Sequence, residues 1–319
     1  MRLGVLTVSL SLLPASLAGQ WPPDRLENLQ VLPDTVPVRQ LVNLMAGFTR
    51  ALGVRCTYCH VGEEGQPLSA YDFPSDDKLT KRKAREMLRM VETINARLLT
   101  TVPERRDPPV DVQCATCHHG VAVPRPLQDV LLLAYDAGGV DSARGTYGSL
   151  RDEYYGAAAY DFGEVPLADV ANVLHRRGTL ADAVALHALN VEHHPASTFA
   201  RMRHARAELE LVFRETGPDA GTARYRELRT AYGAQALPEF ALNELGYALL
   251  RAQHVPAAVR VFELTVEAFP ESANAYDSLG EGYAAAGERT RAIESYEKSL
   301  ALDPDNQNAV EKLRALRGR

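Results

Sequence analysis

Two pentapeptides carry the residues with the clearest chemistry in this chain. Cys56 and Cys59 stand two residues apart and are followed at once by His60, and Cys114 and Cys117 are followed in the same way by His118. C-x-x-C-H is the sequence that attaches c-type haem, in which both thiols bond to one edge of the porphyrin and the histidine ligates the iron. These four cysteines are all that the chain contains. We therefore predict two covalently bound haem c groups.

Other uses of paired cysteines fit the spacing less well. An even cysteine count in an exported protein ordinarily indicates disulfides. A four-cysteine zinc site typically separates its two pairs by about 15 to 20 residues, whereas Cys59 and Cys114 are more than twice as far apart. Zinc would also leave both adjacent histidines without a role. A thioredoxin-like site places its pair after a strand, and neither pair here follows a strand-like run.

A sixth iron ligand for the first haem is offered by Met45. Residues 37–52 have the periodicity of a helix, which Pro37 can begin and Gly53 can end. Its apolar face carries Met45 near the centre, and the helix leads directly into the first pentapeptide. Methionine opposite histidine raises the reduction potential and is typical of electron-transfer sites. The face comprises Val38, Leu41, Val42, Met45, Phe48 and Leu52.

A second helix, over roughly residues 80–99, offers Met87 to the second haem. Met87 lies in the middle of an apolar stripe that also holds Ala84, Val91, Ile94 and Leu98, whereas Met90 lies some 60° away and is the fallback ligand. A basic stripe covers the opposite side of this helix, and we interpret it as a solvated face. Haem propionates or an acidic partner are the alternatives for it. The stripe comprises Lys78, Lys81, Arg82, Arg85 and Arg89.

Residues 37–126 resemble one half of the cytochrome subunit of purple bacterial photosynthetic reaction centres. The resemblance rests on a helix that carries Met45 shortly before the first pentapeptide, on AREMLRMVETIN and on VQCATCHHG. It implies that the first methionine of the M-x-x-M-x-x-x-I-N pattern, Met87, is an iron ligand. The family has four haems, whereas two motifs here imply a dihaem relative. Near Thr101 the chain lacks the distal histidine of the family, which favours methionine on both irons, and His119 stands where the family usually has arginine.

The N-terminal segment has the order of a secretory signal peptide. Arg2 precedes an apolar run over residues 3–13, and residues 16–18 read Ser-Leu-Ala. We predict cleavage after Ala18 and export to the periplasm or beyond. No later run reaches the ~18 apolar residues of a membrane span. Residues 19–126 hold 14 Lys/Arg and 13 Asp/Glu, a balance that gives no support to nucleic-acid binding.

The remainder of the chain, residues 127–319, repeats with a period of 34. Residues 240–273 and 274–307 align best, and they resemble the tetratricopeptide repeat (TPR) in their small, aromatic and proline positions. An earlier copy places Leu167 on Leu242 and Pro195 on Pro270, and the C-terminal segment fits a capping helix. The predicted fold class is all-α: a dihaem module over residues 19–126 followed by a helical solenoid. His187, His193 and His194 are interpreted as surface residues of this solenoid.

The predicted function is that of an exported dihaem cytochrome which carries single electrons and is not an enzyme. Its redox partners would be a membrane-bound respiratory or photosynthetic complex or other cytochromes, and the repeats would dock it to a partner or to copies of itself. Three alternatives remain: a haem-stacking subunit of an electron-conducting polymer, a peroxidase-like enzyme with one open iron, and a redox-sensing TPR platform. His119 is interpreted as a propionate or solvent contact rather than a ligand.

Overall fold

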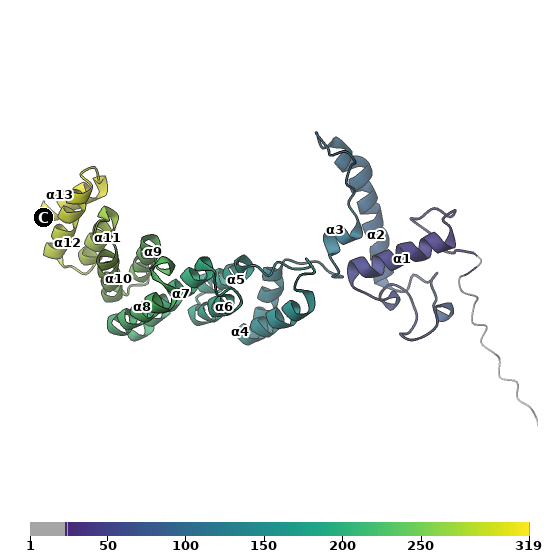
Figure 1. The fold of residues 1–319 in the computed structure, drawn as a ribbon, viewed down its shortest axis with the longest axis horizontal. Coiled ribbons are helices and arrows are strands. Elements are labelled where there is room, and N and C mark those ends of the chain that lie inside the picture. The colour runs from purple at the N-terminus through teal and green to yellow at the C-terminus, as the bar shows by residue number, and fades with distance from the viewer. Residues whose placement is uncertain (1–22, 24, 319) are drawn as a thin grey trace, which may run out of the picture. The chain divides into compact units, whose positions relative to one another are not determined.

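A computed structural model describes residue 23 and residues 25–318, which form two compact units (Figure 1). The predicted signal peptide lies outside the described residues. The first unit ends at Pro124 and also takes in Gly156–Ala159; the second contains Arg125–Tyr155 and the chain from Tyr160 onward. Within the described residues the regular elements are all helical, and one isolated antiparallel bridge joins Val61 to Asp72. The predicted all-α class is confirmed.

The described part of the first unit consists of three α-helices joined by short helical turns and loops. Helix α1 covers Val38–Leu52 and ends, as its sequence predicts, at Gly53, whose φ of 64° is a left-handed conformation that glycine adopts without strain. The elements in chain order are α1 (Val38–Leu52), η1 (Cys56–Tyr58), η2 (Leu68–Ala70), α2 (Leu79–Thr93), η3 (Ile94–Leu98), η4 (Leu99–Thr101) and α3 (Cys114–His118).

The second predicted helix changes its winding before its end. The α-helical part, α2, stops at Thr93, and Ile94–Leu98 continue as a single π-helical turn. Such wider turns are rare and are frequent at functional sites. The predicted range of 80–99 is therefore right in extent, but its last turn is not α-helical.

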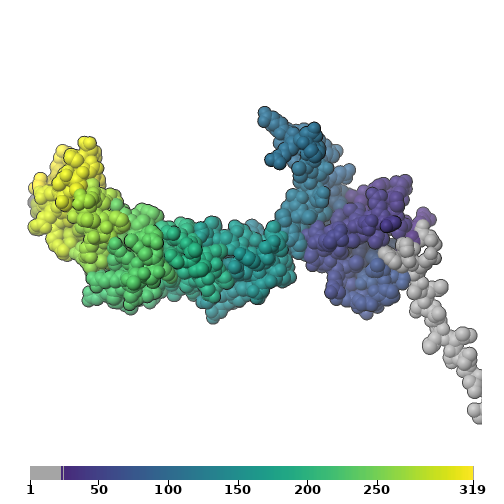
Figure 2. Space-filling view, in the orientation of Figure 1, coloured from purple at the N-terminus to yellow at the C-terminus, as the bar shows by residue number. Residues whose placement is uncertain are grey.

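The second unit is a series of antiparallel helix pairs. The long helix α4 is interrupted by non-helical Gly138 and Gly139, and the pairs that follow it are joined by short turns. Its helices are α4 (Leu127–Tyr154), α5 (Glu164–Arg176), α6 (Leu180–His193), α7 (Thr198–Thr216), α8 (Pro218–Tyr232), α9 (Glu239–Arg251), α10 (Val255–Ala268), α11 (Ala273–Ala285), α12 (Arg289–Leu302) and α13 (Gln307–Arg317), with the short turn η5 (Ala234–Ala236) before α9. In Figure 2 the colours of this unit follow chain order from teal to yellow, as in a solenoid in which each pair contacts its sequence neighbours.

Each of the two clearest repeats contains a glycine that lies against an aromatic ring. A Cβ on Gly246 would lie 2.3 Å from the Phe262 ring, and one on Gly280, at the corresponding position of the next repeat, would lie 2.7 Å from the Tyr296 ring. The small residue lets the two helices of a pair approach closely. The side chains of these helix pairs, Phe262 and Tyr296 among them, build the larger hydrophobic core. A second core forms around Leu131, Tyr147 and Leu167.

Hydrogen bonds show the relation between the earlier and the later copy. The hydroxyl group of Ser197 bonds to Glu164, and that of Ser272 donates to Glu239 at 2.8 Å, in each case from the start of one helix to the start of the preceding antiparallel pair. At one core position of the earlier copy, His187 stands where the later copy has Phe262. His187 is only 3% exposed. The interpretation of His187 as a surface residue is therefore wrong: the repeat places this position in the core.

Candidate haem-attachment sites

The first pentapeptide folds as one tight helical turn. The N–H groups of Cys59 and His60 both donate to the carbonyl of Cys56, at 3.2 and 2.9 Å. Side chains three and four positions apart on a helical turn share a face. The turn therefore directs Cys56, Cys59 and His60 to one side, which is the arrangement that a thioether-linked haem with an axial histidine needs.

The basic side of α2 holds this first motif in place. The ammonium of Lys81 donates to the carbonyls of Phe73, Pro74 and Ser75 at 2.8, 2.9 and 2.7 Å and pairs with Asp76 at 3.2 Å. The Phe73 ring in turn lies edge-on to the His60 ring, with centroids 4.9 Å apart. Lys81 thus fixes the loop that packs against the proposed iron ligand.

Other members of the basic stripe also make contacts within the unit. Lys78 and Thr80 donate to the carbonyls of Thr57 and Tyr58 inside the first motif, and Arg85 pairs with Asp76 at 2.7 Å. Only 12% of the Lys81 side chain and 11% of that of Arg85 are exposed. The interpretation of this stripe as a solvated face is wrong for these residues, because the loops on either side of α2 fold against it.

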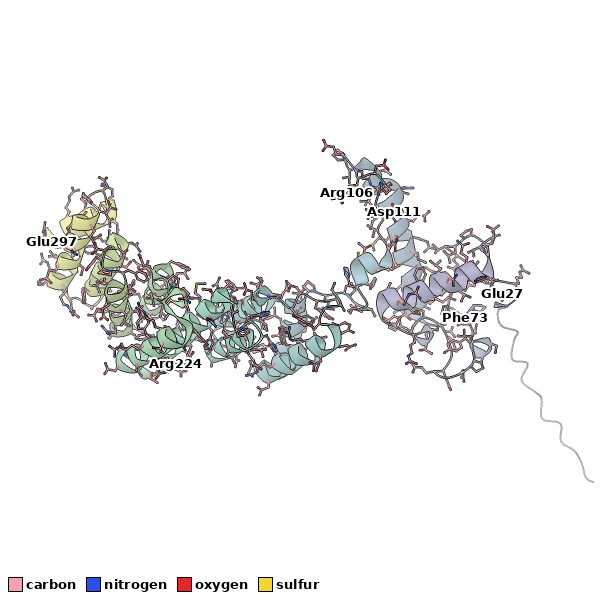
Figure 3. All side chains as sticks on the ribbon, in the orientation of Figure 1. Glu27, Phe73, Arg106, Asp111, Arg224 and Glu297 are labelled. Atoms are coloured by element: carbon pink, nitrogen blue, oxygen red, sulfur yellow. The ribbon has the colours of Figure 1, made fainter. Side chains whose placement is uncertain are left out.

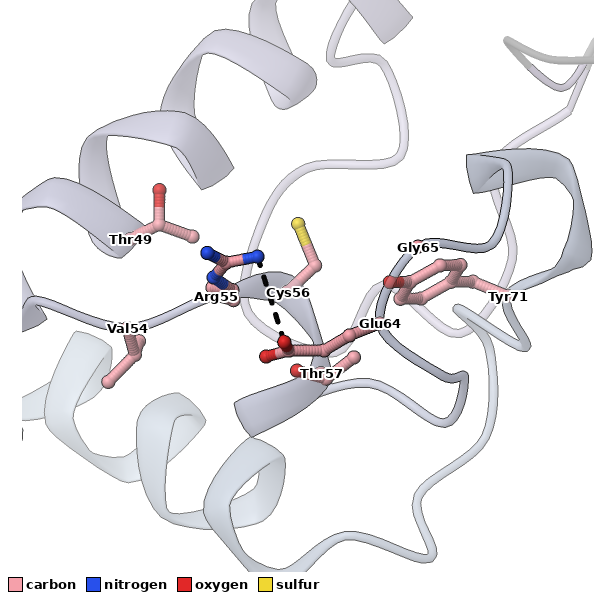
Figure 4. A pocket seen from close by; sticks show the side chains of 8 residues that line it. All are labelled: Thr49, Val54, Arg55, Cys56, Thr57, Glu64, Gly65 and Tyr71. Carbon is pink, nitrogen blue, oxygen red and sulfur yellow. Dashed lines mark ion pairs between the residues drawn. The ribbon is translucent and has the colours of Figure 1, made fainter.

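A pocket of about 350 Å³ opens beside Cys56 (Figure 4). Thr49 of α1 and Tyr71 line it, and the ion pair of Arg55 with Glu64, 3.7 Å long, crosses it. Met45 lies one turn before Thr49 on α1 and is half-buried with its apolar neighbours. The pocket has the size of a small-molecule site, and the first thiol lies in its wall.

The second pentapeptide is a single helical turn, α3, with its histidine in a defined orientation. Gln113 and Thr116 exchange hydrogen bonds that cap the start of the turn. His118 Nδ1 lies 3.0 Å from the carbonyl oxygen of Val121. An Nδ1–H donated to this carbonyl leaves Nε2 with a free lone pair. Metal-ligating histidines are held in this way through their other ring nitrogen.

Two glycines bring the two motifs together. The N–H of Gly120, two residues past His118, donates to the carbonyl of Ala51 at the end of α1, at 2.9 Å. Gly53 lies so close that a Cβ on it would be 2.0 Å from the Gly120 carbonyl oxygen. The end of the second motif therefore contacts the backbone just before the first.

The predicted methionines of α2 are not covered by the polypeptide. Met87 is 45% exposed and Met90 47% exposed, so burial does not separate the two candidates. Leu79, the first residue of α2, and Leu98, in the π-helical turn that follows α2, are 53% and 58% exposed. The other members of this apolar stripe, Ala84, Val91 and Ile94, are partly buried.

The first unit as a whole fits an apolar prosthetic group. Among its described residues, Ala51 is the one buried hydrophobic side chain. Folded units are ordinarily stabilised by burial of apolar surface, and the second unit has two such cores. Two porphyrins tethered through Cys56, Cys59, Cys114 and Cys117 would supply the apolar surface that α1 and α2 leave half-exposed. The residues present therefore fit haem c.

The rival uses of cysteine find less support. None of the four cysteines forms a disulfide, and in the described part of the chain no three His, Cys, Asp or Glu side chains gather as a metal ion would require. Burial raises the pKa of the Cys59 and Cys114 thiols. Reactive dithiols show the opposite shift.

His119 ends the second motif in a left-handed conformation. Its φ is 48°, its side chain is exposed, and its N–H donates to the carbonyl of Ala115 at 3.2 Å. This residue therefore terminates the helical turn through its backbone. Residues other than glycine rarely adopt such a φ, and histidine is among those enriched there.

Sequence reasoning did not identify three features that shape these sites. Lys81 was placed on the solvent side, and the contact between Gly53 and Gly120 joins segments far apart in the chain. Asn95 was noted only as part of a pattern, yet it contacts Val112 just before the second motif. Gly53 ends the first predicted helix, and Gly120 follows the second motif. These two glycines are the one local signal for any of the three features, namely the contact between Gly53 and Gly120.

Comparisons with known proteins match two separate segments of the chain. Residues 11–129 match the family described as photosynthetic reaction centre cytochrome C subunit, and residues 273–306 match the tetratricopeptide repeat. Cytochrome c-554 of Chloroflexus aurantiacus is 34% identical over 100 residues, which are 28% of this chain and 22% of that protein. The chain thus spans about a fifth of the length of this curated relative. The predicted resemblance to a reaction-centre cytochrome and to tetratricopeptide repeats is confirmed, and haem c is the cofactor that the cytochrome match supports.

Solved structures similar to part of the chain include proteins described as TPR proteins. MamA from Desulfovibrio magneticus is 19% identical, with a TM-score of 0.32, and the match covers 50% of this chain and 86% of that one. A thermophilic TPR protein of Thermus thermophilus is 13% identical, with a TM-score of 0.31, over 60% of this chain and 98% of that one. No helix in the described residues is both long and apolar enough to cross a bilayer.

Proposed function

We propose that this chain is an exported dihaem c-type cytochrome that transfers single electrons, with a repeat domain that docks it to a partner or to copies of itself. Residues 19–126 form the haem domain and residues 127–319 the repeat domain in this proposal. One observation carries it: both C-x-x-C-H motifs form helical turns in a unit whose apolar helix faces, among the described residues, have no core of their own.

The proposal assigns the residues that hold each haem. Cys56 and Cys59 form thioethers to the first haem, with His60 and Met45 on its iron. A bound haem whose iron is held by the four porphyrin nitrogens and two protein ligands would exchange single electrons and have no open position for a substrate. The chain's contribution is to hold each histidine at a set orientation, as Phe73 does for His60, and to exclude water with the apolar faces of its helices.

The second haem is held in the same way by the second motif. Cys114 and Cys117 form its thioethers, His118 is the proximal ligand, and Met87 closes the other side, with Met90 as the fallback. The hydrogen bond between His118 and the Val121 carbonyl supports the histidine assignment, because it orients the ring and leaves Nε2 free.

Docking is the role proposed for the repeats. Stacked helix pairs present long continuous surfaces and commonly bind other proteins. The redox partner is proposed to be a membrane-bound complex or another cytochrome, reached after export through the signal peptide of residues 1–18. Removal of residues 127–319 should slow electron delivery to membrane extracts and leave the spectrum of the remaining haem domain unchanged.

Haem content tests the central claim directly. Protein produced in a bacterium that matures c-type cytochromes should carry two haems per chain, measured by the pyridine haemochrome absorbance and by intact mass. Paired Cys56→Ala and Cys59→Ala substitutions should remove one haem and leave the other. A chain with one haem or none would contradict the proposal.

Ligand binding separates a carrier from an enzyme. With a histidine and a methionine on each iron, the reduced protein should resist carbon monoxide, and the oxidised protein should show the sulfur-to-iron charge-transfer band of methionine ligation from both haems. Rapid carbon monoxide binding at one iron would instead support a peroxidase-like enzyme.

A further inference from the structure

Asn95 links the end of α2 to the chain segment that enters the second haem motif. Its Nδ2 donates to the carbonyl oxygen of Val112 at 2.9 Å, and the N–H of Val112 donates to its Oδ1 at 2.8 Å. Both groups are partly buried. The side-chain amide of Asn95 thereby pairs with both the N–H and the carbonyl of Val112, as a neighbouring β-strand would. Val112 lies two residues before Cys114.

The π-helical turn is the element that carries this amide. Ile94–Leu98 form the turn, and the chain beyond it runs back along α2 toward α3, with Arg106 and Asp111 labelled on the way (Figure 3). Arg105 donates to the Val110 carbonyl, a bond that lies within the returning segment itself. Asn95 is therefore the described side chain that joins the segment to the end of α2, across 17 residues of sequence.

Helix α2 and the π-helical turn that follows it therefore connect the first attachment motif to the segment that precedes the second. Near its start, Lys78 and Thr80 donate to carbonyls within the first motif. Just past its end, Asn95 holds a residue that precedes the second motif. Met87 lies on the helix between these contacts. The position of Met87 relative to the second motif therefore depends on the contact at Asn95.

We propose that Asn95 is a positioning residue for the second haem: its paired hydrogen bonds to Val112 set the attachment turn Cys114–His118 at the distance from α2 that lets Met87 reach the same iron as His118. The inference rests on the proposed function and concerns one of the two haems alone. Asn95 itself touches neither haem in this proposal.

The test measures the methionine-to-iron band in Asn95→Leu, a substitution of similar size that can neither donate nor accept. The band intensity should fall to about half, while the haem content stays at two and the far-ultraviolet circular dichroism is unchanged. Glu92→Leu, an exposed position on α2 one turn earlier, is the matched control and should leave the band at full intensity. Asn95→Asp, which keeps the acceptor and loses the donor, provides an intermediate case if the leucine variant does not fold.

Double substitutions assign the effect to one haem. Asn95→Leu combined with Met45→Ala should abolish the band, because each change affects a different iron. Asn95→Leu combined with Met87→Ala should lose no more than Met87→Ala alone. An undiminished band in both Asn95→Leu and Asn95→Asp, or equal loss from both haems, would overturn the inference.

One further readout does not depend on haem ligation. The amide hydrogen of Val112 should exchange at least tenfold faster in Asn95→Leu than in the unmodified protein, because its acceptor is lost. Unchanged exchange would show that Asn95 does not hold this segment. If the unmodified protein shows no methionine band, the methionine ligands of the proposed function are wrong. Slow exchange of the Val112 amide in the same protein would still show that Asn95 holds Val112.

Discussion

Gly53 and Gly120 approach each other so closely that no side chain fits between their backbones. A Cβ on Gly53 would lie 2.0 Å from the Gly120 carbonyl oxygen, and the Gly120 N–H bonds to Ala51 beside it. The two haem motifs stand far apart in the sequence, and this contact joins their flanks.

Gly53→Ala should therefore separate the two motifs. The methyl group meets backbone rather than a movable side chain, and we expect a loss of about 2–4 kcal/mol in the free energy of unfolding, together with a poorer yield of dihaem protein. Gly65→Ala is the matched control, because its φ of 85° is also left-handed but a Cβ there would meet nothing within 4 Å. It should cost only about 1 kcal/mol. Equal losses in chemical denaturation would contradict the proposed contact.

Lys81→Met should loosen the loop that supports His60. The substitution keeps the aliphatic stem but removes the donor to the carbonyls of Phe73, Pro74 and Ser75, so we expect a destabilisation of about 2–3 kcal/mol and faster proteolysis near residues 72–76. Lys83→Met, two positions along and exposed, should change stability by less than about 0.5 kcal/mol. A loop that stays resistant to protease in Lys81→Met would show that other contacts suffice.

His187 should make the repeat domain sensitive to acid. Burial, with His204, Arg203, Arg206 and His175 nearby, lowers the pKa of His187 to about 3. The unfolded chain, with a histidine pKa near ~6.5, binds the proton first. Stability from the neutral ring is thus complete above about pH 6.5 and declines by up to about 1.4 kcal/mol per pH unit as the pH falls toward 3.

Urea denaturation between pH 7 and 4.5, followed by circular dichroism, measures this dependence. In His187→Leu, the free energy of unfolding should fall less steeply with decreasing pH, because the buried histidine no longer takes up a proton on unfolding. The same slope in both proteins would mean that His187 is not the group that takes up the proton.

Gln253→Gly should stabilise the repeat domain. Gln253 has a φ of 64° in the turn between α9 and α10, and the equivalent positions in the other copies, Gly178 and Gly287, have φ values of 87° and 78°. Only glycine adopts this conformation without strain, so a gain of about 0.5–1 kcal/mol is expected. Gly287→Ala should give a loss of similar size. Thermal unfolding of both variants in parallel tests these two predictions. A lower melting temperature for Gln253→Gly would contradict the expected gain in stability.

Helix α2 shows that local periodicity identifies the faces of a helix but not which of them is exposed to solvent. The apolar stripe with Met87 at its centre was predicted from spacing alone, because a helix repeats every 3.6 residues whatever surrounds it. The opposite stripe, although equally regular, was interpreted as solvated, and Lys81 and Arg85 are instead covered by loops. Charge pattern identifies a face of the helix, but the loops that fold over that face come from elsewhere in the chain.

The sequence by itself determined the two C-x-x-C-H motifs, the helix that ends at Gly53, and the repeats of the C-terminal part, since each of these depends on residues close together or on direct self-similarity. Only the tertiary structure decided that Gly53 lies against Gly120, that Asn95 holds Val112, and that His187 takes a core position. These contacts join segments separated by loops whose path no local pattern specifies. Their energies arise when the chain has closed on itself, which is why spacing and composition do not reveal them.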